Sequence, residues 1–281
     1  MTLRCLATTL LLLATATAED GTSRPQPATD IRVSPAGWGS ADPENIGKVL
    51  ESTVAQFRPH LAKRHFPTIV VSHDKDGPIT RYKRGAGGEI FVGLNVSNRY
   101  WAQYAFQFSH EFCHILCNYR PDASPNRWFE ESLCETAALF ALRSMAREWK
   151  DSPPYPNWRE FSSSLKKYAD ARLKKFSLAK DTPFSTWFKR NEASLRANPR
   201  SRDKNGTVAV FLLPLFEKDP SRWEAVGSLN LQAAKKRESF REFLQRWHAA
   251  APKKHRGFIA DLAKRFGLTI PKNGKPGNPG I

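Results

Sequence analysis

The segment from residue 98 to residue 119 is the part of the sequence that most constrains the fold. Its large apolar side chains recur every three or four residues, which is the spacing of one face of an α-helix. This apolar stripe consists of Trp101, Ala105, Phe108, Phe112 and Ile115. The spacing predicts one long helix with a buried face.

The same predicted helix carries His110, Glu111 and His114 in the pattern His-Glu-x-x-His. Residues four apart lie one turn above the other on a helix, so both imidazoles can bind a single metal ion. Glu111 can then reach a water on that metal without binding the metal itself. The chain has seven histidines, and we estimate that such a pattern arises by chance in roughly one chain in a hundred. We therefore predict a metal-binding helix that needs a third ligand.

The third ligand does not come from the continuation of this helix. One class of zinc peptidase extends the pattern as His-x-x-Gly-x-x-His. Cys117 stands where that glycine would be, and Arg120 stands where that histidine would be. This class is excluded.

A second predicted helix, over residues 126–149, offers acidic ligands after a proline-containing turn. Glu131 and Glu135 are four residues apart and share a face, whereas the spacing directs Glu130 elsewhere. Apolar residues lie on the same face as Glu131 and Glu135, which predicts that the face is buried: Trp128, Ala138 and Leu142. A buried acid needs a partner, so Glu131 is our candidate ligand. The alternative is a solvated acidic face, which is the usual role of such clusters.

The stretch Trp128-Phe-Glu-Glu-Ser-Leu-Cys-Glu135 resembles the second active-site helix of gluzincin metallopeptidases, the group that includes thermolysin-like and aminopeptidase N-like enzymes. The resemblance covers residues 89–142. It implies a zinc ion held by His110, His114 and Glu131, with Glu135 as the downstream acid. The chain departs from the pattern at Ser132, where a glycine is usual. It also has no segment of the kind that engages a substrate's amino terminus in the aminopeptidases.

The resemblance implies hydrolysis of a peptide or protein substrate. Zinc would lower the pKa of a bound water to about 7. Glu111 would take the water's proton as general base and pass it to the leaving amine. Glu135 either holds one of the histidines in place or is exposed. No motif singles out an oxyanion donor among Tyr155, Tyr168 and His248, and none of the three is assigned.

The remaining pattern predicts an α+β chain in which a small sheet and the His-Glu-x-x-His helix precede a mainly helical part. Strands are predicted over residues 67–72 and 89–94, and the second is expected to be an edge strand that pairs with substrate. Helices are predicted over 45–58, 158–176, 207–216, 239–249 and 258–266, with Pro214 weakening the third of these. We assign residues 31–270 to a zincin-like domain, with an α/β front over 31–119 and a helical body over 120–270. Residues 271–281 are expected to form a disordered tail.

The first eighteen residues have the form of a secretory signal peptide that is cleaved near Ala18. Residues 19–30 form a polar, flexible leader, and no stretch approaches the roughly 20 apolar residues of a transmembrane helix. We therefore expect a secreted or periplasmic protein. Cleavage would leave three cysteines, of which Cys117 and Cys134 either form a disulfide or pack as thiols in the core.

The chain of 281 residues has a net charge of +17. This charge predicts at most non-specific association with anionic surfaces, because no nucleic-acid-binding pattern accompanies it. The charge also supports an alternative function, a non-catalytic exported protein that binds acidic glycan or cell-envelope polyanions. Glu111 argues against that alternative, because a structural metal needs no general base.

Overall fold

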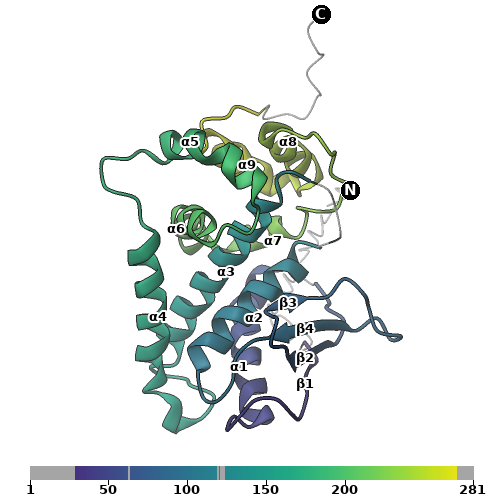
Figure 1. The fold of residues 1–281 in the computed structure, drawn as a ribbon, viewed down its shortest axis with the longest axis vertical. Coiled ribbons are helices and arrows are strands. Elements are labelled where there is room, and N and C mark those ends of the chain that lie inside the picture. The colour runs from purple at the N-terminus through teal and green to yellow at the C-terminus, as the bar shows by residue number, and fades with distance from the viewer. Residues whose placement is uncertain (1–28, 63, 119, 121–123, 271–281) are drawn as a thin grey trace, which may run out of the picture.

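The computed structural model describes residues 29–62, 64–118, 120 and 124–270. The predicted signal peptide, all but the last two residues of the predicted leader, and the predicted tail lie outside the described residues. The described part is an α+β structure in which a small sheet lies beside a larger body of helices (Figure 1). The predicted fold class is confirmed at this level.

The sheet has four strands in the order β1-β2-β4-β3. β1 (Ile31–Val33), β2 (Ile69–His73) and β4 (Ile90–Leu94) are parallel, and β3 (Ile79–Thr80) runs antiparallel to β4. Helix α1 (Pro43–Ala55) connects β1 to β2, as a parallel pair requires. The sheet therefore begins with a β-α-β unit and ends on a short antiparallel strand.

The prediction that residues 89–94 form an edge strand is wrong. β4 pairs with β2 on one side and with β3 on the other, through Ile79 opposite Gly93 and Thr80 opposite Val92. The edge next to the candidate site is therefore β3. Its two residues lie inside a segment rich in turn residues, and so short a strand leaves no alternation for a pattern to detect.

Two long helices follow the sheet. α2 (Trp101–Leu116) carries the His-Glu-x-x-His pattern, and all five members of its predicted apolar stripe are buried. α3 (Arg127–Glu148) packs along α2 and also contacts α4 (Phe161–Phe176) and α6 (Arg202–Lys218). Figure 1 shows α3 in the middle of the molecule, with helices around it.

The C-terminal end of α2 is held by a side chain from the front of the chain. Arg64 donates to the carbonyl oxygens of Leu116 and Ile115 at 2.6 and 3.1 Å. These carbonyls belong to the last turn of the helix, where backbone acceptors lack helical partners. A guanidinium there satisfies them and opposes the negative end of the helix dipole. Helix α2 is therefore fixed at the end that carries His114.

Each of the remaining predicted helices corresponds to an observed helix, but lengths and bounds do not always agree. The third predicted segment belongs to α6, which begins before the predicted residue 207 and continues through Pro214. The last two predicted segments correspond to α8 (Phe240–Ala250) and α9 (Lys253–Arg265). Two helices were not predicted, α5 (Phe184–Ala197) and α7 (Trp223–Val226). Within the described part of the chain, no helix is both long and apolar enough to span a membrane.

Candidate metal centre

The candidate site lies where α2 and α3 face each other, and α3 is almost completely enclosed there. From Trp128 to Leu142 every residue is buried except Glu130, Glu131 and Glu135. The predicted burial of the apolar residues on this face is confirmed, since Trp128, Ala138 and Leu142 are 0% exposed. In this stretch of α3, the three acids are therefore the residues that solvent reaches, and we call this the opening in α3.

Glu131, the candidate third ligand, lies close to both histidines. Its Oε2 atom is 3.4 Å from Nε2 of His110 and 3.8 Å from Nε2 of His114. Zinc ligands about 2 Å from the ion in a tetrahedron are separated by about 3.3 Å. One carboxylate oxygen of Glu131 thus lies near both Nε2 atoms, close to this spacing for His110 and somewhat beyond it for His114.

The Nδ1 atom of each histidine faces a different carboxylate. Oε1 of Glu130 lies 2.6 Å from Nδ1 of His114, and Oε1 of Glu135 lies 3.7 Å from Nδ1 of His110. The prediction that Glu130 points elsewhere is wrong, because α3 crosses α2 so that neighbouring acids reach successive turns. A carboxylate on Nδ1 orients the ring and leaves Nε2 for a metal.

Both of these outer carboxylates are themselves held. Nδ2 of Asn230 donates to Oε2 of Glu130 at 2.7 Å, and the guanidinium of Arg120 donates to the backbone oxygen of Asn230. Arg172, from α4, lies 3.8 Å from Oε2 of Glu135. Segments far apart in sequence therefore fix the direction of each histidine.

Glu111 lies on the side of α2 that faces the sheet. Thr80, in the edge strand β3, donates from Oγ1 to Oε2 of Glu111 at 2.7 Å. Glu111 is 3% exposed and Thr80 is 8% exposed. The carboxylate that we predict to be the general base is therefore held by the strand that forms the edge of the sheet.

The exposed guanidinium of Arg200 lies near the carboxylate of Glu131. Its Nε atom is 3.8 Å from Oε1 of Glu131, and its side chain is 75% exposed. The loop that carries it is tied to α3 through the buried Asn205, which donates to the carbonyl of Pro199 at 2.7 Å and lies 3.5 Å from the hydroxyl of Ser132. The hydroxyl of Ser132 donates mainly to the carbonyl of Trp128, at 2.8 Å.

The carboxylates strongly affect the protonation of both imidazoles. Burial alone would lower the pKa of His114, but the hydrogen bond with Glu130 and the charges of Glu130, Glu111 and Glu131 raise it to about 10. The pKa of His110 is also raised, because the hydrogen bond with Glu131 and nearby carboxylates outweigh burial. Burial would raise the pKa of Glu131, but the two histidines and Arg200 lower it to about 2. A divalent cation would compete with these protons for the same nitrogen atoms.

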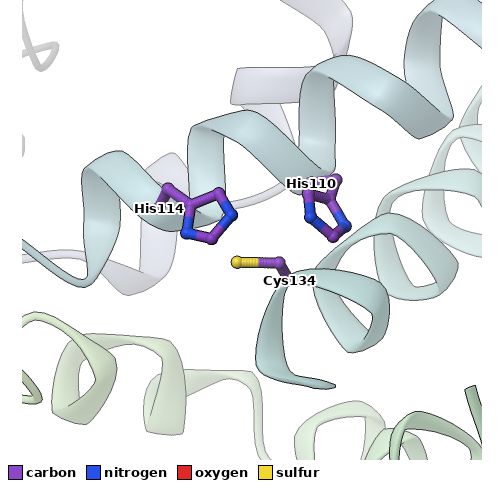
Figure 2. A group of neighbouring side chains, drawn as sticks. All are labelled: His110, His114 and Cys134. Atoms are coloured by element: carbon purple, nitrogen blue, oxygen red, sulfur yellow. The ribbon is translucent and has the colours of Figure 1, made fainter. Parts of the chain in front are cut away.

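Cys134 is a second possible third ligand, and the sequence patterns did not indicate it. Figure 2 shows its side chain pointing from α3 toward His110 and His114, and ligand atoms of the three residues lie within 4.8 Å of one another. Cys113, Cys117 and Cys134 are buried free thiols, so the packing alternative holds over the disulfide. We favour Glu131 over Cys134, because Oε2 of Glu131 lies 3.4 and 3.8 Å from the two Nε2 atoms and because Glu131 is at the opening in α3, whereas Cys134 is 0% exposed.

The three unassigned oxyanion candidates lie in different surroundings. Tyr168 stacks edge-on against Phe106 and accepts a hydrogen bond from Arg172 at 3.2 Å. Tyr155 packs against Trp158 at the other end of α2. His248 is buried in α8. Besides Cys134, sequence patterns missed Thr80 and Arg200, because no motif surrounds either residue.

Comparisons of the chain with models of protein families, with curated proteins and with solved structures found no match.

Proposed function

We propose that the protein is an exported, zinc-dependent peptidase. The observation that carries this proposal is the convergence of the Nε2 atoms of His110 and His114 on Oε2 of Glu131, at 3.4 and 3.8 Å, while each Nδ1 atom faces another carboxylate. Three protein ligands with the fourth position left for water are the arrangement of catalytic zinc sites. The resemblance to gluzincins supports the same set of ligands.

Each side chain has a defined role in the proposed reaction. His110, His114 and Glu131 would hold the zinc, which would supply Lewis acidity to a bound water and to the scissile carbonyl. Glu111 accepts the proton of the attacking water and delivers it to the leaving amine. Thr80 keeps the Glu111 carboxylate in one orientation through its 2.7 Å hydrogen bond.

Arg200 is the cation best placed to stabilise the oxyanion in this proposal. It is anchored by the loop contacts of Asn205, yet most of its side chain is open to solvent. A preformed donor next to the reacting carbonyl stabilises charge that develops in the transition state. The same guanidinium also holds the outer oxygen of Glu131.

The test measures zinc content and peptide cleavage in the purified mature protein. Elemental analysis should give one zinc per chain in the wild type and in Glu111→Gln, while only the wild type cleaves unstructured peptides. Cleavage retained by Glu111→Gln would contradict the mechanism. A chain without zinc under metal-replete conditions would favour the alternative, a basic exported protein that binds polyanions.

A further inference from the structure

A groove lies along α2 on the same face as the candidate metal centre, toward the N-terminal end of the helix. It consists of two adjoining cavities of about 440 and 400 Å³, which share Arg99, Trp101 and Phe161 as lining residues. The larger cavity is bounded by the first turn of α2 and by α4. Cavities of this size are large enough to enclose a large side chain.

The groove is aligned with the histidines. Gln103 lines the larger cavity and precedes His110 by two helical turns, so both side chains leave α2 in nearly the same direction. Seven residues of helix correspond to about 10 Å. An extended peptide covers this distance with about three residues.

A continuous series of contacts connects the groove with the metal centre. Tyr168 lines the groove and packs against Phe106, and the guanidinium of Arg172 lies 3.7 Å from the centroid of the Phe106 ring. Arg172 also contacts Glu135, which faces His110. The side chains of Phe106, Tyr168 and Arg172 therefore form the surface between the groove and the site.

The lining of the groove combines apolar surface with positive charge. Tyr100 is 58% exposed, although aromatic side chains of this size are usually covered. Arg99 and Lys167 are the charged residues of the larger cavity, and no carboxylate lines either cavity among the described residues. Both cations are exposed, and no ion pair of either is found in the described part of the chain. The groove therefore complements a ligand that is both apolar and acidic.

We propose that this groove binds an acidic segment of the polypeptide substrate, with an aromatic or large aliphatic side chain in the cavity about three residues from the bond that is cut. The proposal rests on the proposed peptidase function. It assigns specificity to Arg99 and Lys167, which flank the bound side chain. The net charge of +17 favours the same class of substrate.

The first experiment measures binding without turnover. A fluorescein-labelled, unstructured peptide in which phenylalanine is flanked by glutamates is titrated with the full chain carrying Glu111→Gln, and anisotropy gives Kd. Reversing both charges, with Arg99→Glu and Lys167→Glu, should weaken binding about tenfold. Filling the groove with Ala171→Trp should weaken it by a similar factor. Lys189→Glu with Lys253→Glu, on α5 and α9, is the matched control for net charge and should leave Kd unchanged.

Two further peptides separate a groove from a merely basic surface. Replacing the phenylalanine by serine, or the glutamates by lysines, should each weaken binding to the unaltered groove. Equal binding of the serine peptide, or equal weakening by the control variant, would overturn the proposal. Unchanged zinc content in the groove variants shows that the metal centre is intact.

The second experiment makes failure of the groove distinct from failure of the peptidase. Products from a mixed peptide library are sequenced by mass spectrometry for the wild type and for the Arg99→Glu, Lys167→Glu variant. An apolar residue with acidic neighbours should be enriched about three residues from the cut in the wild type alone. Cleavage with the same preference in both proteins overturns the groove and keeps the peptidase. Binding that depends on the groove without any cleavage keeps the groove as a peptide site and overturns hydrolysis.

Discussion

Glu130 and His114 are joined by a contact of 2.6 Å between a carboxylate oxygen and Nδ1. It is shorter than the contacts that Glu131 and Glu135 make with the histidines of α2, and it leaves the Nε2 atom of His114 directed toward Glu131. The contact assigns Glu130 a positioning role that is separate from that of the ligand.

Glu130→Ala should lower zinc affinity without abolishing it. Loss of the carboxylate that orients a metal-binding histidine costs between about 10-fold and 100-fold in affinity. Competition with a chelator of known affinity measures the change. Glu148→Ala, at the exposed end of the same helix, serves as the control and should have the affinity of the wild type.

Glu131→Ala should lose bound zinc, whereas Cys134→Ala should keep it. The reason is that the Glu131 oxygen lies near both Nε2 atoms at ligand spacing. Elemental analysis gives the metal content of each variant. Cobalt substitution provides an independent measurement, since an intense thiolate charge-transfer band would show that Cys134 is the ligand and that our assignment is wrong.

Thr80→Val should reduce kcat/KM about tenfold while zinc content stays the same. The change keeps the shape of the side chain but removes the hydroxyl that holds the Glu111 carboxylate, a hydrogen bond to a charged group. Thr80→Ser retains the hydroxyl and should recover most of the activity. Steady-state kinetics on an unstructured peptide measures both variants, and a Ser variant as impaired as the Val variant would argue against the role of this hydrogen bond.

Arg200→Ala should lower kcat by roughly a hundredfold, with a smaller effect on KM. A donor to the oxyanion acts mainly in the transition state, and its removal typically has this size. Arg200→Lys retains the charge and should recover part of the rate. If Arg200→Ala binds zinc more weakly but its zinc-loaded form has the kcat of the wild type, the guanidinium only holds Glu131 in place.

His248 should make the fold less stable in mild acid. Burial, reinforced by the charge of Arg256, lowers the pKa of His248 below its usual value of 6.5. Between the unfolded and folded pKa values the unfolded chain binds a proton that the folded chain does not. The free energy of unfolding therefore falls as the pH drops below about 6.5, by up to about 1.4 kcal/mol for each pH unit in that window. Urea unfolding at pH 7.5 and at pH 5.5 should show a smaller loss for His248→Gln than for the wild type, and an equal loss would contradict the assignment.

The sequence predicted the elements with strong periodicity and missed those without it. The stripe that ends at Ile115 predicted α2, and the acids after Trp128 predicted the face of α3 that meets it. β1 and β3 have three and two residues, too few for any pattern. α5 was missed because only three of its 14 residues are buried, Phe184, Phe188 and Leu195, and mainly polar residues separate them.

Within the site, helical spacing predicted His110, Glu111 and His114 on α2 and, together with the resemblance, Glu131 on α3. It could not predict which acid faces which Nδ1 atom, because that depends on how α3 crosses α2. Thr80 and Arg200 reach the site through pairing and loop contacts with distant segments. Neither residue has a local pattern that distinguishes it from an ordinary surface residue.

Because α3 is enclosed, the geometry of the candidate metal centre depends on side-chain packing elsewhere in the molecule. Helices on several sides fix the rotation of α3 about its axis, and that rotation sets where the oxygen of Glu131 lies relative to two nitrogens on α2. A truncation deep in the helical body, such as Leu212→Ala, changes that rotation by a small amount. The spectrum of a bound cobalt ion would then register, as a shift in ligand field, a packing defect that lies outside the site.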